Sequence, residues 1–430
     1  MGIFDRVKGG TVHYIRDLRR LTPNARRYLM GAFFLGMTSA AFSLLLNLYL
    51  KQRGFEEGFI GSVLSAGGIG MTVVAIPGAI LLARISLKPV LLISSIFYVI
   101  CGLTAVYSDS KTMIWGAYFM AGAMTTFPRI GAGPFFMRNS SATERPYLFS
   151  LSFGIGVVAG VVGSIVFGEL VKYFSVTGGY DLIWAYRLSL TVGILFSIAS
   201  LIPFSLLSVP NEVPSEDKLD FNRRTLAPMS GLYLRLLLPS FIVGIGAGII
   251  IPFLNLFFNE RFGRSADQIG IYFGLVNLTM FIGVMAGPVL VRKIGMVRTM
   301  VFTELASIPF MLVLAYCYSL PLVFAAFLIR GALMNMGSPI GNNFAMEMVP
   351  KAHQGLLNAL LTFSWTSSWM ISTQVGGIVI QYYGFTLSLV IAVVLYVFSA
   401  LLYYYYFHQV ERRTPEGIII QPGYRPVGES

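Results

Sequence analysis

The chain has 430 residues, of which 56% are hydrophobic and only 12% are charged. Because soluble domains carry about 25% charged residues, this composition excludes a soluble globular protein and indicates a membrane protein. The formal net charge of +12 does not point to nucleic acid as a partner. In a membrane protein the basic excess belongs to the cytoplasmic loops, and no aromatic residues are interleaved with a basic patch here.

Cysteine and histidine are sparse and scattered. Cys101 and Cys317 both lie within apolar stretches, where small packing residues are expected rather than a disulfide. The three histidines lie far apart, so their spacing does not suit a metal ion. The sequence therefore predicts no metal site and no cofactor.

Residues 1–25 form a basic N-terminal segment. Its apolar residues recur at roughly helical spacing, which is consistent with an amphipathic helix on the cytoplasmic leaflet. A disordered basic tail that only orients the first span is an equal alternative.

Twelve apolar stretches follow that are long enough to cross a bilayer, since a helix needs about 20 residues to span the hydrocarbon core. They are expected at residues 26–50, 58–83, 89–108, 112–137, 146–170, 182–207, 230–258, 267–291, 297–317, 321–346, 354–380 and 385–408. The long polar segment 208–229 separates six spans from six and is expected to link two halves, 26–207 and 230–408, before a tail at 409–430. The predicted fold class is an all-α membrane protein with twelve transmembrane helices in two pseudo-symmetric six-helix bundles.

The distribution of Lys and Arg predicts the orientation. With the N-terminus inside, 22 of the 31 Lys and Arg residues fall on the cytoplasmic side, 7 fall in outer loops, and Arg129 and Arg330 fall within spans. This bias predicts that both termini are cytoplasmic, in a plasma or inner membrane.

One stretch of the chain occurs twice. Residues 46–53 read LNLYLKQR, and 208 positions later residues 254–261 read LNLFFNER. At an offset of 209, Gly61 corresponds to Gly270 and Gly168 to Gly377. A repeat of about half the chain, with both copies starting inside, predicts a parallel duplication about an axis normal to the membrane.

With these features the chain resembles the major facilitator superfamily. In that family the loop between helices 2 and 3 reads Gly, three residues, Asp-Arg, any residue, Gly-Arg-Arg/Lys. Residues 78–88, GAILLARISLK, keep the basic positions as Arg84 and Lys88 but lack the aspartate, and the second half places Arg292 and Lys293 in the equivalent loop. The resemblance implies that these four residues belong to the loops that govern the conformational change.

Helices 4 and 5 add weaker similarities. Arg129 and Gly131 are similar to the family's helix 4 motif, and helix 5 has glycines at 156, 160, 163 and 168. The helix 5 glycines resemble a motif of the family's antiporters. That motif contains a Gly-Pro pair, whereas this sequence has Gly163-Ser164 at the same place. Close helix packing through small residues is sufficient on its own to explain these glycines.

The resemblance implies a monomeric secondary transporter that moves a small organic or amphiphilic solute by rocker-switch alternating access. Two alternatives remain at this stage: a lipid or lysolipid flippase on the same fold, and a non-transporting membrane sensor. An enzyme is not predicted, because no nucleophile–base pair, carboxylate pair or metal cluster lies at membrane depth. The expected partners are the lipid bilayer and a small molecule, with no nucleic acid.

Three charged residues fall well inside predicted spans: Arg129, Arg330 and Glu304. A charge at the centre of a membrane costs about 2.5–3.5 kcal/mol on insertion scales, so each is expected to face protein or a water-filled cavity. Arg129 and Arg330 are candidate binding residues for an anionic or zwitterionic substrate, or alternatively they bond to helix carbonyls and polar neighbours. Glu304 is the candidate proton-coupling acid, unless it pairs with Arg330 on the adjacent helix.

Polar and aromatic residues within spans complete the candidate site. Trp365 and Trp369 share one helical face near mid-membrane, and Gln374 on the same helix and Asn335 on helix 10 are further candidate substrate contacts. Asn47 and Asn255 are expected to face each other at the outer ends of helices 1 and 7, as an outer gate that closes by hydrogen bonds. The alternative for each asparagine is an ordinary interhelical hydrogen bond.

Overall fold

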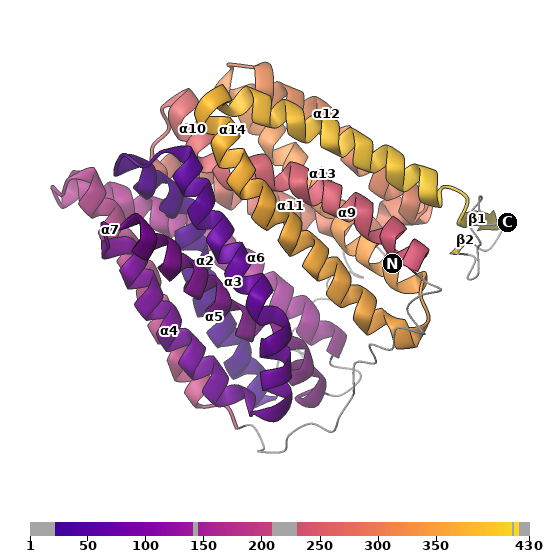
Figure 1. Ribbon diagram of the computed structural model, residues 1–430, viewed down its shortest axis with the longest axis horizontal. Helices are drawn as coiled ribbons and strands as arrows, with labels where there is room; N and C mark the ends of the chain where they lie inside the picture. The colour runs from indigo at the N-terminus through magenta and orange to yellow at the C-terminus, as the bar shows by residue number, and fades with distance from the viewer. Residues whose placement is uncertain (1–21, 141–144, 209–229, 415–416, 421–430) are drawn as a thin grey trace, which may run out of the picture.

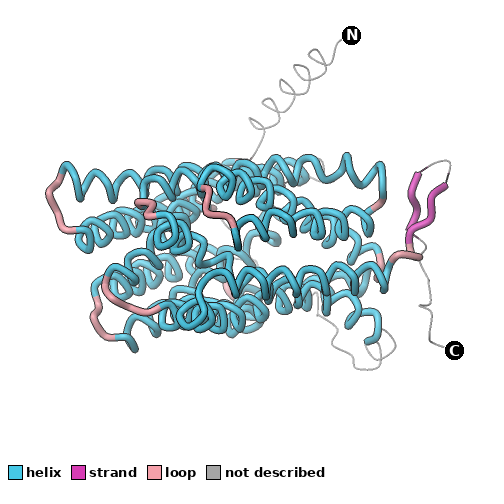
Figure 2. Tube along the Cα trace, turned by 90° about the horizontal axis from the view of Figure 1, so that it is seen from above, coloured by secondary structure: helices cyan, strands magenta, loops and turns pink. Residues whose placement is uncertain are grey.

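The computed structural model describes residues 22–140, 145–208, 230–414 and 417–420, and nearly all of this chain is helical (Figures 1 and 2). The predicted segment 1–25 therefore lies almost wholly outside the described residues, as does most of the linker at 208–229. The helices are α2 (Pro23–Gln52), α3 (Glu57–Arg84), α4 (Leu87–Tyr107), α5 (Lys111–Arg138), α6 (Arg145–Lys172), α7 (Leu182–Ser205), α9 (Ser230–Ile250), α10 (Leu254–Phe262), α11 (Ala266–Ile294), α12 (Met296–Tyr316), α13 (Leu320–Glu347) and α14 (Lys351–Phe407).

Three short elements complete the described chain. A π-helical turn, η1 (Tyr173–Thr177), extends α6, and a 3-10 turn, η3 (Ile251–Phe253), joins α9 to α10. Beyond α14, β1 (Glu411–Thr414) and β2 (Gly417–Ile420) form an antiparallel hairpin, which the sequence analysis did not predict.

The helix ends lie within a few residues of the ends of the predicted spans, except that two predicted spans are joined into one helix. α14 contains both of the last two predicted spans, which meet at Gly384, where φ is +78°. This left-handed conformation suits glycine, which has no Cβ to clash, and it kinks the helix between the two spans. Ten described helices are long and apolar enough to cross a membrane when α14 is counted once; α5, which carries Arg129, is not among these ten.

The helices form two groups. Figure 1 shows α2 to α7, in indigo to magenta, beside α9 to α14, in red to yellow. In the first group the chain enters and leaves at the same end, because the Asn24 Nδ2 atom donates a hydrogen bond of 2.7 Å to the Ser208 carbonyl. In the second group the start of α9 and the end of α14 likewise meet in one apolar cluster that contains Tyr233 and Phe407. We call this end of the molecule the terminal end, and the opposite end the distal end.

The two bundles touch at two close helix crossings. At the α3–α14 crossing, a Cβ on Gly61 would lie 3.1 Å from the Gly377 Cα atom and 2.6 Å from a carbonyl oxygen of α14. At the α6–α11 crossing, a Cβ on Gly270 would lie 3.3 Å from the Gly168 Cα atom and 2.3 Å from a carbonyl oxygen of α6. The four glycines that correspond in the sequence repeat therefore form the two crossings, and the repeat exchanges one crossing with the other.

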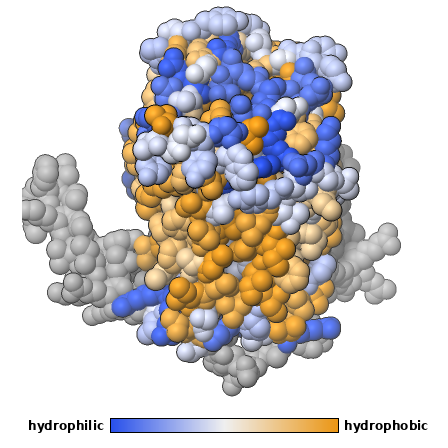
Figure 3. All heavy atoms as spheres, turned by 90° about the vertical axis from the view of Figure 1, so that its left-hand side faces the viewer, coloured by the Kyte–Doolittle hydropathy of each residue, from blue (hydrophilic) through white to orange (hydrophobic). Residues whose placement is uncertain are grey.

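The outer surface suits a lipid environment. Large apolar side chains such as Ile76, Ile93 and Phe398 are exposed on α3, α4 and α14. On the face drawn in Figure 3, hydrophilic residues gather at the upper end and apolar residues cover much of the surface below them. Contact with lipid tails explains this exposure, which water would disfavour.

Candidate functional site

A cavity of about 830 Å³ lies between the two bundles. Most of its wall comes from α2 to α6, and the second bundle contributes Ile251, Pro252, Phe273, Asn277 and Trp369. The cavity reaches from Asn47, toward the distal end, to Tyr28 and Phe204, toward the terminal end.

Arg129 is the one charged residue that lines this cavity. It lies on α5, and its side chain is accessible from the cavity although protein surrounds it on its other sides. Among the described residues, nothing forms a hydrogen bond or an ion pair with its guanidinium group. Its guanidinium group interacts electrostatically with Tyr98, which lines the same cavity with Tyr118.

The rest of the wall mixes aromatic rings, small residues and hydroxyl groups. Trp369 enters from α14, and its ring lies 5.9 Å from that of Trp365 at an angle of 35°. The hydroxyl-bearing residues of the wall are Ser39, Ser43, Ser94, Ser95, Thr125, Ser152 and Ser164, in addition to the three tyrosines, Tyr28, Tyr98 and Tyr118. Asn277 adds an amide from α11, although its Nδ2 atom already donates to the Phe273 carbonyl at 2.8 Å.

Of the predicted substrate contacts, Arg129 and Trp369 line the cavity, and four others do not. Arg330 is buried inside the second bundle, where only 5% of it is exposed, and its Nη2 atom donates to the Tyr396 hydroxyl at 3.0 Å. Asn335 donates to the carbonyl of Gly331 on its own helix. Trp365 is 41% exposed outside the cavity wall, and Gln374 is half-buried away from it.

Glu304 lies near the middle of α12, also inside the second bundle. Its Oε1 atom is buried without a hydrogen-bond partner in the described part of the chain, and Ser399 of α14 is its polar neighbour. The anticipated ion pair between Glu304 and Arg330 does not form; Tyr396 instead interacts electrostatically with both groups. Arg330 therefore bonds to a phenol, and Glu304 keeps one free oxygen.

The two repeated asparagines meet at the distal side of the cavity. The Asn47 Nδ2 atom donates to the Asn255 Oδ1 atom at 3.2 Å and to the Pro252 carbonyl at 2.6 Å. In return, the Asn255 Nδ2 atom donates to the Leu44 carbonyl at 2.8 Å. Both asparagines are almost fully buried. Each therefore crosses from its own bundle to the backbone of the other.

Ion pairs close the distal end beyond the asparagines. Lys51 at the end of α2 contacts Glu57 of its own bundle and lies 3.3 Å from the Glu260 Oε1 atom of the other. Lys172 of α6 similarly lies 3.4 Å from the Asp267 Oδ2 atom of α11. The sequence analysis missed these pairs, although the Lys51 and Glu260 positions fall inside the two copies of the repeat.

The four basic loop residues lie at the terminal end. Arg84 is in the last turn of α3, and Arg292 and Lys293 are in the last turn of α11, where positive charge complements the helix dipole. Lys88 lies in the first turn of α4.

Two helical bundles related by a parallel repeat, with a cavity between them, form an architecture typical of membrane transport proteins. The chain belongs to the Major Facilitator Superfamily, whose sequence profile matches residues 28–239 and 236–422. The predicted resemblance is therefore confirmed over both halves. No curated protein matches the sequence significantly.

Solved structures share the fold at low sequence identity. The nucleoside transporter NupG superposes with a TM-score of 0.72 at 14% identity, covering 89% of this chain and 98% of that one. A bacterial homologue of the human lysosomal transporter Spinster, in an inward-facing and unoccupied conformation, gives 0.73 at 13% identity, covering 88% and 95%. A bacterial homologue of the iron transporter ferroportin, also inward-facing, gives 0.65 at 14% identity, covering 88% and 97%. Identities this low show the fold alone.

Proposed function

We propose that the protein is a secondary transporter that carries a small organic anion, or an amphiphile with an anionic group, by alternating access. The observation that carries this proposal is the unpaired guanidinium group of Arg129 in the central cavity. An unpaired charge at membrane depth is costly, and a carboxylate or phosphate is the partner that a guanidinium group binds best. A bound anion would supply that partner.

The size and wall of the cavity suit an organic solute. Its volume of about 830 Å³ lies within the range of about 300–1,000 Å³ that is usual for small-molecule sites. Tyr98, Tyr118 and Trp369 offer apolar ring surface near the cation, and the serine hydroxyls offer hydrogen bonds to polar substituents. An anionic group with an apolar or hydroxylated body would satisfy both.

The conformation is assigned as inward-facing. The two bundles are held together at the distal end by the Asn47–Asn255 contact and the Lys51–Glu260 ion pair. The Lys and Arg distribution places the terminal end in the cytoplasm. On this assignment Asn47 and Asn255 form the outer gate, and they separate when the bundles rock to the outward-facing state. The protein acts as a monomer, since each chain contains both bundles.

Coupling to protons is assigned to Glu304, which among the described acidic residues is the one that lies near the middle of its helix. It lies outside the cavity wall, so its effect on the substrate must pass through the packing of the second bundle. A change in the charge of Glu304 would reach α13 and α14 through Tyr396 and Arg330, which interact with each other.

Reconstitution into proteoliposomes tests the proposal. Under an imposed pH gradient, a panel of labelled organic anions, cations, neutral solutes and lysophospholipids is offered, and uptake is compared with protein-free vesicles. We expect accumulation of an anion, and we expect Arg129→Gln to lower the apparent affinity about 10- to 100-fold, since hydrogen bonds to charged groups contribute about 1.5–3 kcal/mol.

The matched control is Arg298→Gln, which removes an exposed arginine at the terminal end of α12. Equal loss in both variants, or transport that is confined to cations and neutral solutes, contradicts the anion site. Movement of labelled lysophospholipid alone would identify the flippase instead.

A further inference from the structure

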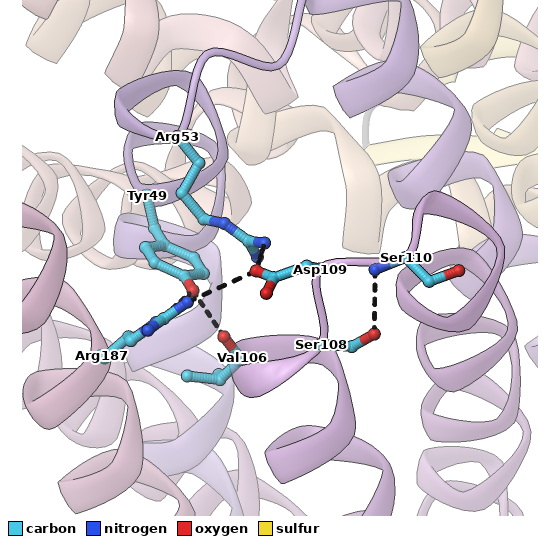
Figure 4. Close-up of polar contacts among 7 residues, drawn as sticks. All are labelled: Tyr49, Arg53, Val106, Ser108, Asp109, Ser110 and Arg187. Atoms are coloured by element: carbon cyan, nitrogen blue, oxygen red, sulfur yellow. Dashed lines mark hydrogen bonds and ion pairs between the residues drawn. The ribbon is translucent and has the colours of Figure 1, made fainter.

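A cluster of cationic side chains lies at the distal end of the first bundle, apart from the cavity that contains Arg129. There Arg53 at the end of α2 and Arg187 of α7 both approach Asp109 in the loop between α4 and α5 (Figure 4). The Arg53 Nη2 atom lies 2.6 Å and the Arg187 Nη2 atom 3.7 Å from the same Asp109 Oδ1 atom. Two guanidinium groups thus share one carboxylate oxygen.

Aromatic rings hold the cations in place. The Tyr49 hydroxyl donates to the Val106 carbonyl and accepts a hydrogen bond of 3.0 Å from the Arg187 Nε atom, as Figure 4 shows. The Arg53 guanidinium carbon lies 5.1 Å from the centre of the Phe55 ring. The same ring lies 5.9 Å from the Lys111 Nζ atom. Lys111 therefore belongs to the same cluster.

The charges of this cluster do not balance. Arg53 and Arg187 pair with one acid, Asp109, whose side chain is 87% exposed, and Lys111 adds a third, exposed cation over the Phe55 ring. The Arg53 side chain is only 7% exposed, and its Nη1 atom has no hydrogen-bond partner in the described chain. The two largely buried guanidinium groups therefore share a single negative charge, and a further anion would neutralise the remainder.

The equivalent positions of the second bundle differ. Arg261, which corresponds to Arg53 in the repeat, donates from its Nη1 atom to the carbonyls of Leu314 and Ala315 at 2.9 and 3.0 Å. Its Nη2 atom, like Arg53 Nη1, has no hydrogen-bond partner in the described chain. At an offset of 209 the positions that correspond to Arg187 and Lys111 are Tyr396 and Leu320. Of the three cations of the cluster, only Arg53 therefore has a basic counterpart in the second bundle.

We propose that this cluster binds the phosphate group of an anionic membrane lipid. The phosphate would take the place of the Asp109 carboxylate between the guanidinium groups. The position favours a lipid over a soluble phosphate, because the cluster lies where α2, α4, α5 and α7 reach the membrane surface. Exposed rings of Tyr107 and Trp184 flank Arg187, at 5.8 and 5.0 Å from its guanidinium carbon. Such rings lie at the headgroup level of membranes, beside the acyl chains.

The purified protein in detergent provides the test. Phosphatidylglycerol, phosphatidylcholine or inorganic phosphate is added at equal phosphate concentration, and bound lipid is counted by native mass spectrometry while the unfolding midpoint is measured. We expect phosphatidylglycerol to bind in preference to phosphatidylcholine. Arg187→Gln and Lys111→Gln should each weaken this binding roughly fivefold, the usual effect of one basic residue at an anionic membrane surface. Arg298→Gln, at the terminal end, is the control and should leave it unchanged.

Asp109→Asn separates a lipid site from a purely structural network. Removing the competing carboxylate should strengthen binding of phosphatidylglycerol, whereas a structural network would only lose stability. Equal binding of the two lipids, weaker binding in Asp109→Asn, or equal stabilisation by inorganic phosphate would each overturn the proposal. None of these outcomes depends on the transported substrate, so they are independent of the proposed function.

Discussion

At the scale of single residues, the two arginines within the membrane spans have opposite surroundings. Arg129 faces the cavity without a hydrogen-bond or ion-pair partner among the described residues, whereas Arg330 is enclosed by its bundle and bonded to Tyr396. An arginine that is already satisfied by a phenol inside packed helices is not free to bind a solute. The candidate anion site therefore rests on Arg129 alone.

Glu304 gives the residue-scale prediction. In Glu304→Gln the side chain keeps its shape and loses its exchangeable proton, so the bundle should still fold. We expect substrate accumulation driven by a pH gradient to fall to the equilibrium level, while exchange of labelled for unlabelled substrate continues. Uptake and counterflow assays in proteoliposomes measure the two quantities.

Glu169→Gln is the matched control, because Glu169 is an exposed acid in the last turn of α6. It should preserve accumulation. If Glu304→Gln also preserved accumulation, Glu304 would have a structural role only, and the coupling assignment would be lost.

The sequence located Arg129, Trp369 and Asn47 at the cavity because a charge, an indole and an amide are unusual at membrane depth. Trp365, which was predicted beside Trp369, lies outside the wall of this cavity. A transmembrane helix is apolar on every side, so no hydrophobic pattern distinguishes its inner face from its lipid face. Tyr98 and Tyr118 were missed for the same reason. The rotation of each helix, which decides these positions, is set by packing against its neighbours.

At the scale of helices, four glycines determine how closely the bundles approach. Each lies at a crossing where a Cβ atom would meet backbone atoms of the other bundle, which no side-chain rotation can relieve. Close packing of this kind is the usual role of small residues between membrane helices. The repeated glycines in the sequence therefore mark the surfaces through which the two bundles contact each other.

Gly270→Ala gives the prediction at this scale. Its methyl group would meet a carbonyl oxygen of α6 at 2.3 Å, and overpacking of this kind costs about 1–3 kcal/mol. The distally closed state should therefore lose population to the distally open one. A cysteine at Ser39 of the cavity wall, in a chain without Cys101 and Cys317, should react with a maleimide from the terminal side about 10- to 100-fold more slowly.

Gly154→Ala on α6 is the control, because a Cβ at Gly154 meets no atom within 4 Å. The reaction rate in that variant should match that of the unsubstituted chain. A Gly270→Ala protein that reacted equally fast would show that the crossing adjusts without opening the distal end.

The sequence also predicted the helices well, because each span is a long apolar stretch between polar loops. Two details were missed. The single span expected at 230–258 is broken into α9 and α10 by the 3-10 turn at Pro252, and the last two spans share one continuous element that is kinked at Gly384. Both are changes in local backbone conformation, which the hydropathy of a segment does not predict. The only apolar run in the hairpin β1–β2 is residues 418–420, which is far too short to be read as a membrane span.

At the scale of the whole molecule, the sequence supported the duplication, the family and the two-bundle architecture. The sequence does not predict which end of the molecule is closed, because hydropathy and motif patterns do not record how the two bundles are tilted against each other. The structure shows the bundles joined distally, by residues that come from both copies of the repeat. If the bundles alternate as proposed, the strength of these polar contacts sets the balance between the two states.

The Lys51–Glu260 pair gives the prediction for the whole molecule. In Lys51→Glu, three carboxylates would meet at positions 51, 57 and 260, and their repulsion should part the bundles distally. The double variant Lys51→Glu/Glu260→Lys restores an opposite charge between two acids, so it should close the distal end again. Spin labels at Gln52 and Tyr383, both exposed at this end of opposite bundles, would report a longer distance in the single variant only.

Salt and mutational coupling sharpen this test. Lys51 and Glu260 are each about one-third exposed, so their interaction is screened by ions, and a coupling of at most about 1 kcal/mol is expected for a pair at the surface. The distal opening in Lys51→Glu should accordingly shrink at high ionic strength. If the double variant stayed as open as the single one, the Lys51–Glu260 pair would not hold the distal end closed, and the remaining contacts, such as the Lys172–Asp267 pair, the asparagine contact and the glycine crossings, would have to do so.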